Sequence, residues 1–316
     1  MANSEVVKQG FFRKKKETVN VNEDKSIQIS KTSNFIWHIA FIALSIICIY
    51  PMLLVLMVTI TDETTIALEG YKLIPSKFSL SAVKFIITNS SAIINAYGIS
   101  IFCTVVGGLL GVLIMALYAY PLAREDFKYA RVFNVIVVIT MMFSGGFVPT
   151  YIVYTKILCL KDTIWALVLM NLFSAFNVMI IRTYYKTSIS KSLIEAAQID
   201  GASEFRTYFK IVLPLSKPVI ATMLMMVMLV YWNDWFGPML YIDSEELYNL
   251  QYLMYQLESK IANLSKMAGN PELVKSVPSE TARMAMAVVA IGPIILAYPF
   301  FQRYFEKGIT LGATKE

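Results

Sequence analysis

The side chains that could carry out chemistry are few in this chain of 316 residues, and they form no reactive cluster. One His and three Cys provide no set of ligands for a metal ion and no pairing of a nucleophile with a base. The dipeptide Gly-Lys, which a Walker A loop requires, does not occur. We therefore expect no catalytic residue, no metal and no cofactor on this chain, and any hydrolysis of ATP must take place on another protein.

A polar segment suited to docking, residues 195–214, lies between two long apolar runs and reads EAAQIDGASEFRTYFKIVLP. Ser192 and Glu195 have the spacing of a capping box, which predicts a short helix that continues to Ile199. Gly201 stands where this helix can end in a left-handed conformation. Capping could account for Glu195 by itself, although capping is compatible with docking.

A second short helix is predicted directly after this bend. Ser203 can cap it, and its apolar residues fall at positions i, i+3, i+4 and i+7. These residues are Phe205, Tyr208, Phe209 and Val212. Pro214 and Pro218 close the segment before the next apolar run. Two short helices around a bend of small residues make a compact knob, and the Ala-Ala pair permits close approach to a partner surface.

Residues 231–236, which read YWNDWF, combine aromatic faces with hydrogen-bonding side chains, a combination suited to binding a small polar molecule. Asp234 is the one carboxylate within an apolar run, and such residues usually face a bundle interior or a water-filled cavity. The alternative is a helix end at the membrane surface, where Trp side chains form an aromatic belt. The candidate substrate-path residues of this segment are Tyr231, Trp232, Asn233, Asp234 and Trp235.

The elements that position these residues are predicted to be membrane helices. Hydrophobic residues make up 57% of the chain and charged residues 16%, with a mean hydropathy of +0.59. Six apolar runs are long enough to cross about 30 Å of hydrocarbon as helices. They are Phe35–Ile60, Ala96–Tyr120, Val132–Tyr154, Thr163–Ile181, Val219–Ile242 and Met284–Phe301. The sequence therefore predicts an all-α integral membrane protein with six transmembrane helices, in which a tail (1–34) precedes a transmembrane domain (35–316).

The distribution of positive charge predicts the orientation in the membrane. The segments 1–34, 121–131, 182–217 and 302–316 hold 19 of the 28 Lys and Arg. By the positive-inside rule, both termini and the polar loop 190–218 lie in the cytoplasm. The net charge of +6 then reflects membrane topology. We expect a lipid bilayer around this chain and no nucleic acid as a partner.

Two further patterns concern packing. Gly107, Gly108 and Gly111 give a small-xxx-small pattern, which predicts close helix packing, with a hinge as the alternative. The outer segment 243–282 is acidic and holds apolar residues at helical spacing, which predicts an amphipathic helix. Its apolar residues are Leu250, Leu253, Met254, Leu257, Ile261 and Leu264. This helix could contact an external partner or pack as a lid on the chain's own outer face.

The polar loop resembles a known element. Its pattern of E-A-A, three residues, Gly, nine residues and I-x-L-P is similar to the cytoplasmic coupling loop of permease subunits in binding-protein-dependent ABC importers. Residues 35–316 as a whole resemble the carbohydrate-uptake class, and most of all the second, shorter permease of maltose-type and complex-oligosaccharide importers. The segments that carry this likeness are FSGGFVPTY (143–151), SAFNVMIIRTYY (174–185), IDGASE (199–204), IVLPLSKP (211–218), WNDWF (232–236) and QRYFEKGITLGATKE (302–316).

The resemblance implies a type I importer permease fold with a cytoplasmic coupling helix in a cell membrane. It implies three kinds of partner: a second homologous permease, two ATPase subunits that hold ATP and Mg, and an external sugar-binding protein, which the segment 243–282 would approach. The coupling residues it implies are Glu195, Ala196, Ala197, Asp200, Gly201, Phe205, Leu213 and Pro214. Gly308, Gly312 and Lys315 of the tail are implied contacts with the ATPases, and Asn177 is an implied substrate-path residue. For Asn171 and Asn177 alike, an interhelical hydrogen bond is the alternative.

Two other functions remain open from the sequence. Importers of peptides or amino acids share the broader coupling-loop pattern. A secondary transporter could use Asp234 to carry protons, but it would need no coupling loop, and six spans are half of many such folds.

Overall fold

The computed structural model describes residues 30–88, 90–267 and 280–313, with the side chains at 31, 261, 264–267, 297–298 and 300–313 left aside. The chain divides into two units, Met1–Met52 and Leu53–Glu316. Their border falls within helix α1 (Lys31–Thr59), which forms all of the described part of the first unit and reaches a mean hydropathy of 2.7. The predicted tail 1–34 lies almost entirely outside the described residues.

The second unit is helical throughout its described part, apart from loops and one isolated bridge that pairs Thr61 with Phe78. Its helices are α2 (Glu63–Glu69), α3 (Ser81–Thr88), α4 (Ser90–Phe102), α5 (Gly108–Ala123), α6 (Ala130–Met142), α7 (Phe147–Ile152), α8 (Ile164–Met170), α9 (Ala175–Ser188), α10 (Lys191–Ile199), α11 (Glu204–Thr207), α12 (Leu213–Leu215), α13 (Lys217–Trp232), α14 (Phe236–Tyr241), α15 (Leu250–Met267) and α17 (Glu280–Ala313). Wide π-helical turns at Cys103–Gly107, Val153–Ile157 and Tyr208–Val212 join neighbouring helices, and Glu245–Leu247 form a single 3-10 turn.

The predicted all-α architecture is confirmed, but three of the six runs are not straight helices. Among the described residues, two helices could each cross a membrane alone by length and composition, and bent pairs raise this number to five. The predicted third span is bent by 111° between α6 and α7, and the fourth by 50° between α8 and α9. The predicted fifth span is also interrupted, because α13 ends at Trp232 and α14 begins at Phe236.

Each interruption has a local cause in the sequence. Gly146 has a φ of +83°, which a residue with a side chain rarely adopts, and it ends the break between α6 and α7. Ser174 caps α9 by accepting a hydrogen bond from the Asn177 amide at 3.4 Å. Asn233 and Asp234 both favour helix ends over helix interiors, and they lie between α13 and α14. Average hydropathy could not reveal these breaks, because the runs stay apolar across them.

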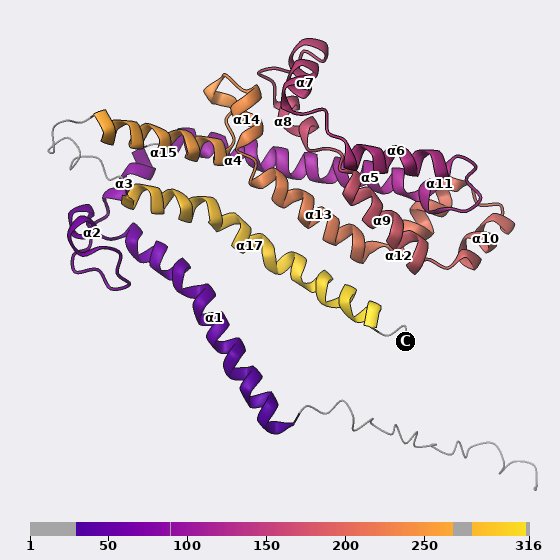
Figure 1. The fold of residues 1–316 in the computed structure, drawn as a ribbon, viewed down its shortest axis with the longest axis horizontal. Helices are drawn as coiled ribbons and strands as arrows, with labels where there is room; N and C mark the ends of the chain where they lie inside the picture. The colour runs from indigo at the N-terminus through magenta and orange to yellow at the C-terminus, as the bar shows by residue number, and fades with distance from the viewer. Residues whose placement is uncertain (1–29, 89, 268–279, 314–316) are drawn as a thin grey trace, which may run out of the picture. The chain divides into compact units, whose positions relative to one another are not determined.

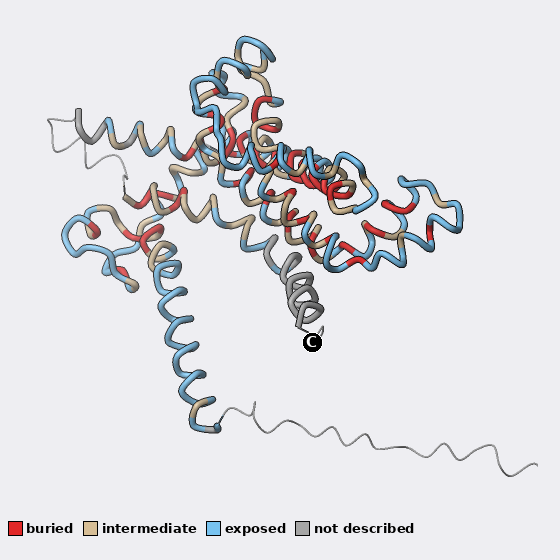
Figure 2. Tube along the Cα trace, turned by 45° about the vertical axis from the view of Figure 1, so that its right-hand side comes forward, coloured by how far each residue is buried: buried red, intermediate tan, exposed pale blue. Residues whose placement is uncertain are grey.

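Helix α5 forms the centre of the second unit, where it packs against α9 and α13 (Figure 1). The buried residues in Figure 2 concentrate along these three helices, and Met115, Val178 and Ile181 are fully buried. The glycine pattern explains how the helices come so close. A Cβ on Gly108 would lie 2.8 Å from Met228 Cγ, and one on Gly111 would lie 2.8 Å from the Leu172 carbonyl oxygen. The prediction of close packing at these glycines is confirmed.

The segment 243–282 contains the predicted amphipathic helix, α15 (Leu250–Met267). Its apolar face packs on α4 and α17, where Leu250 and Met254 are buried together with Trp232. The alternative of a lid on the chain's own surface is therefore confirmed for this face. The side chains of Ile261 and Leu264 lie outside the described residues. A partner-contact role for the opposite face stays a prediction.

Candidate functional site

The first helix of the polar loop does not begin as predicted. Helix α10 starts at Lys191 with Ser190 as its N-cap residue, and the Ser190 hydroxyl lies 2.7 Å from that of Ser192. The capping-box prediction for Ser192 and Glu195 is wrong, because the chain enters the helix before Ser192 and both residues lie inside it. Glu195 is exposed, and no described side chain forms a hydrogen bond with its carboxylate. Capping therefore does not account for Glu195.

The bend that follows α10 has the predicted conformation. Gly201 has a φ of +74°. Its amide donates to the Gln198 carbonyl at 3.0 Å, and the Ala202 amide donates to the Ala197 carbonyl at 2.9 Å. These two hydrogen bonds form a Schellman motif with Gly201 in the left-handed position. The structure confirms that Gly201 ends the helix.

The second helix of the loop, α11 with the π-helical turn that follows it, buries one face and exposes the other. Ser203 caps α11 by accepting a hydrogen bond from the Arg206 amide at 3.4 Å, as predicted. Tyr208 and Val212 are buried, but Phe205 is 74% exposed and Phe209 is 46% exposed. The four apolar residues at helical spacing therefore do not share one buried face. The π-helical turn over Tyr208–Val212 places residues four apart on the inward side, so the two phenylalanines face outward.

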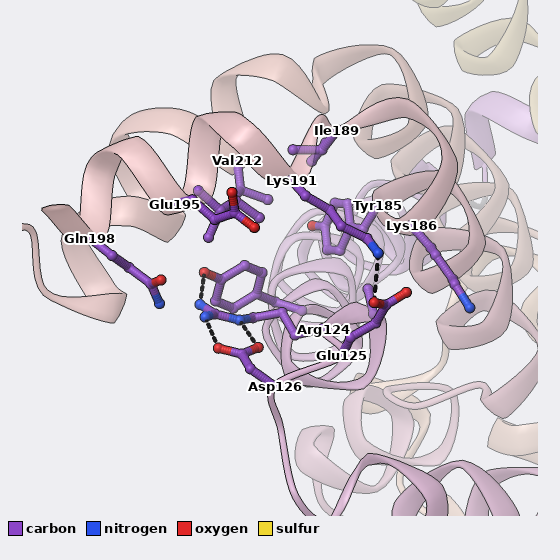
Figure 3. Close-up of a pocket in the computed structure, with 13 residues that line it drawn as sticks. Arg124, Glu125, Asp126, Tyr185, Lys186, Ile189, Lys191, Glu195, Gln198 and Val212 are labelled. Atoms are coloured by element: carbon purple, nitrogen blue, oxygen red, sulfur yellow. Dashed lines mark hydrogen bonds and ion pairs between the residues drawn. The ribbon is translucent and has the colours of Figure 1, made fainter.

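A cluster of charged and polar side chains joins this loop to the end of α5, and Figure 3 shows the part of it around Arg124 and Asp126. The Arg124 guanidinium binds Asp126 with two hydrogen bonds, one of them 2.7 Å between Nε and Oδ1. It also forms an ion pair with Glu204 and donates to the Tyr120 hydroxyl at 3.0 Å. The Tyr120 hydroxyl in turn donates to Glu204 Oε2 at 3.0 Å. The Gln198 amide of α10 lies 3.4 Å from Glu204 Oε1, so this cluster holds both helices of the loop.

The electrostatics of the cluster follow from its burial and pairing. The Arg124 side chain is 11% exposed. Its hydrogen bonds with Asp126 raise the pKa of Arg124 and lower that of Asp126, although burial opposes both shifts. Both groups are therefore charged at neutral pH. A hollow of about 200 Å³ beside them is lined by Glu195, Gln198 and Lys191, among other residues.

Sequence reasoning missed Tyr120, Arg124 and Glu204 as site residues. The sequence offers one indication of such a site, the three successive charged residues at 124–126, which follow the inner end of a predicted membrane span. Glu204 lies within the IDGASE segment, but nothing local links it to Arg124, which is 80 positions away.

The predicted coupling residues lie mostly at the surface of the loop. Those that are exposed are Glu195, Ala196, Asp200, Gly201, Phe205 and Pro214, while Leu213 is half-buried and Ala197 is buried. Ile199, beside the bend, is 87% exposed. The loop therefore presents Ile199 and Phe205, two large apolar side chains, on either side of Gly201.

The predicted substrate-path residues separate into two groups. Tyr231 and Trp232 are buried, and their polar atoms donate to backbone carbonyls of Val168 at 2.5 Å and Ala290 at 3.1 Å. These two side chains are therefore held within the packed interior of this chain. Asn233 is exposed, and Trp235 is 43% exposed and stacks on Tyr255 with ring centroids 4.9 Å apart.

Asp234 forms hydrogen bonds with residues of three separate segments. Its carboxylate accepts a hydrogen bond from Asn171 Nδ2 at 3.1 Å, in the break of the fourth span, and one from the Gly237 amide at 2.9 Å, at the start of α14. Its backbone carbonyl accepts a hydrogen bond from Asn249, directly before α15. The interhelical hydrogen bond predicted as the alternative role of Asn171 is therefore present.

The remaining predicted site residues are less constrained. Asn177 is half-buried in the first turn of α9, and no described residue bonds its side-chain amide. Gly308 and Gly312 lie within α17, and Lys315 lies outside the described residues. Their contact with an ATPase stays a prediction.

The described part of the chain thus combines bent apolar helices with a polar two-helix loop that a charged cluster holds to the end of α5. The family of binding-protein-dependent transport system inner membrane components matches residues 121–311. The chain belongs to this family. It is a membrane-spanning, non-enzymatic subunit that works with a separate ATPase and a substrate-binding protein.

Several relatives extend the likeness over most of the chain. The polygalacturonan/rhamnogalacturonan transport system permease protein YtcP of Bacillus subtilis is 36% identical over 276 residues, which cover 86% of this chain and 94% of YtcP. The arabinooligosaccharides transport system permease protein AraQ of Halalkalibacterium halodurans is 29% identical, over 88% of this chain and 95% of AraQ. Among solved structures, a chain of a bacterial ABC transporter involved in the import of the acidic polysaccharide alginate has a TM-score of 0.74 and 26% identity, over 88% of this chain and 99% of that chain.

Proposed function

We propose that this chain is one half of the membrane channel of an ATP-driven importer of oligosaccharides. It acts with a second, homologous permease, with two ATPase subunits that bind ATP and Mg, and with an external sugar-binding protein. The observation that carries the proposal is the coupling loop, residues 190–218. Its Schellman bend at Gly201 exposes Ile199 and Phe205, while Tyr208 and Val212 fix the loop to the membrane helices.

The substrate class is supported by the relatives. YtcP and AraQ are named for the transport of polysaccharides or oligosaccharides, and the structural neighbour belongs to a transporter involved in the import of alginate. Asn233 and Trp235 follow α13 two positions apart and are both exposed, and they provide an amide oxygen and an aromatic ring. The Asn233 amide nitrogen donates to the Leu229 carbonyl at 2.8 Å, and the Trp235 ring stacks on Tyr255. Such a pair suits a sugar ring.

Uptake by reconstituted vesicles tests this function. Vesicles that contain the chain, its second permease and the ATPase are supplied with the binding protein and an oligosaccharide mixture released from polygalacturonan. We expect uptake only with ATP. Uptake that follows a proton gradient without ATP would instead support a secondary transporter, and uptake of peptides alone would overturn the substrate class.

The membrane orientation gives a second prediction. The segment before α8 is proposed to face outward, so Cys159, which is exposed, should react with a membrane-impermeant maleimide added to intact cells. A tag placed after Glu316 should become accessible only after permeabilisation. Cys159→Ser is the matched control and should lose the labelling. A tag accessible in intact cells would contradict the proposed orientation.

A role of Trp235 in the sugar path gives a third prediction. Trp235→Ala should lower uptake of the polygalacturonan-derived probe by roughly threefold to tenfold, because an aromatic contact worth about 1 kcal/mol is lost. Assembly with the ATPase should stay unchanged. Trp165→Ala is the matched control, since Trp165 is 49% exposed on α8 and belongs to a membrane-surface belt in this proposal. Equal uptake by both variants would indicate that Trp235, like Trp165, belongs to the aromatic belt at the membrane surface and not to the sugar path.

A further inference from the structure

We propose that Arg124 and Glu204 are positioning residues that transmit movement of the coupling loop to the membrane helices, an inference that rests on the proposed function. Arg124 directly follows α5, the central helix of the second unit. Glu204 is the first residue of α11, next to the bend at Gly201. Their ion pair is therefore a direct bond between the docking knob and the core of the membrane domain.

Asp126 holds the Arg124 side chain in place independently of Glu204. Asp126 binds Nε and Nη2 of the guanidinium, which leaves Nη1 directed at the loop. A planar guanidinium held by two parallel hydrogen bonds keeps its orientation better than an ammonium group does. The orientation of the Arg124 guanidinium is therefore restricted, unlike that of a cation on a solvent-exposed side chain.

The Glu204 carboxylate, although 58% exposed, is hydrogen-bonded by three residues from two helices of the loop and membrane domain. Its Oε2 atom receives hydrogen bonds from Arg124 and from the Tyr120 hydroxyl, and its Oε1 atom lies 3.4 Å from Gln198 Nε2. Gln198 is on α10 and Tyr120 is on α5. A displacement of either loop helix therefore pulls on α5 through a single carboxylate.

Packing below the ion pair supports the same connection. One turn beyond Glu204, the Tyr208 ring lies 5.1 Å from the Tyr120 ring, and Tyr208 is buried. From there α5 continues to the glycines that contact α13 and the break of the fourth span. The elements between the knob and Asp234 are thus in contact with one another, and chains of packed side chains of this kind can carry coupling between distant sites.

A second ion pair on the same face provides the matched control. Lys191 and Glu125 are 2.6 Å apart, but their side chains are 66% and 62% exposed. Solvent screens such a pair, and exposed pairs contribute little. The Lys191–Glu125 pair also connects the loop with the end of α5. It differs from the Arg124–Glu204 pair in the burial of its cation, since Arg124 is 11% exposed, and in the number of its partners, while Glu204 is 58% exposed and so resembles Glu125 in exposure.

The test measures transmission without any sugar. Trp235→Cys is introduced into the full complex, in a chain whose own three cysteines are replaced by serine, and its labelling by an impermeant maleimide is timed with and without ATP and vanadate. ATP and vanadate should change the labelling rate about fivefold or more, the usual lower range of coupling between sites. Glu204→Gln and Arg124→Gln should each reduce this change to below about twofold, and the double variant should be no worse than either single one. Glu125→Gln should retain the full change.

The outcomes separate the possible failures. Co-purification of the ATPase and the temperature of unfolding show whether each variant still folds and assembles. A full ATP response in Glu204→Gln, or additive losses in the double variant, would overturn the proposal. An unchanged labelling rate in the reference complex would contradict transmission to the Trp235 segment. If Gly201→Val also keeps the response, the assignment of the coupling loop itself fails, and with it the proposed function of this segment.

Discussion

Gly201→Val should abolish ATP-driven uptake while the protein remains folded in the membrane. The left-handed conformation at φ +74° costs a β-branched residue roughly 1 kcal/mol or more relative to Gly. Among the described residues, apart from the two chain neighbours, no heavy atom lies within 4 Å of a Cβ built on Gly201, so this chain leaves space for the start of the new side chain. Apart from the backbone strain, we therefore expect the added volume to act mainly through a steric clash with the partner that the exposed bend contacts.

Two variants separate backbone strain from bulk at this bend. Asn tolerates a left-handed conformation, so Gly201→Asn adds volume with little strain. Gly70→Val is the control outside the loop, since Gly70 also has a positive φ of +73° and open space around its Cβ position. With a ψ of −166° its backbone is even less accessible to Val than a left-handed helical one, so this control carries at least as much backbone strain as Gly201→Val. Uptake and stimulated ATP hydrolysis in purified complexes should fall strongly in Gly201→Val, less in Gly201→Asn, and little in Gly70→Val. Wild-type transport by Gly201→Val would mean that residues 195–214 are not the coupling element.

Local rules were sufficient for part of the site. The left-handed Gly201 and the Ser203 cap follow from residue types at fixed offsets, and both are present in the structure. The capping box failed because the same local rule fits more than one start of the helix. Ser190 and Ser192 are both capping residues by type, and tertiary contacts around α10 decide between them.

The ion pair between Arg124 and Glu204 could not be predicted, because it depends on which ends of α5 and α11 the fold brings together. The interrupted spans illustrate the same limit. Hydropathy reports how long a run stays apolar, and the runs containing Asn171 and Asp234 stay apolar on average. A hydrogen bond joins these two side chains, and the Asp234 carboxylate also accepts one from the Gly237 amide, a backbone donor that the break leaves without a helical partner. A break inside a membrane domain is tolerated where protein covers it.

Gly111→Val should prevent stable folding of the second unit. Gly111 lies on α5, and a Cβ there would come within 2.8 Å of the Leu172 carbonyl oxygen. This neighbour is a backbone atom in the break between α8 and α9, so no side-chain rotation can relieve the clash. Gly111→Ala should already destabilise the protein by about 1–3 kcal/mol, the usual cost of overpacking. Leu172 follows Asn171, so any shift also disturbs the bond to Asp234.

The matched control for this prediction is Gly98 in α4, which belongs to the same continuous apolar helix, Ser90–Ala123. A Cβ on Gly98 meets no heavy atom within 4 Å, so Gly98→Ala should leave stability unchanged or raise it slightly through higher helix propensity. The temperature of unfolding in detergent should fall for Gly111→Ala and not for Gly98→Ala. Equal stability of the two variants would show that close contact between α5 and the break in the fourth span does not contribute to stability. The carboxylate of Asp234 would then depend on other contacts for its position.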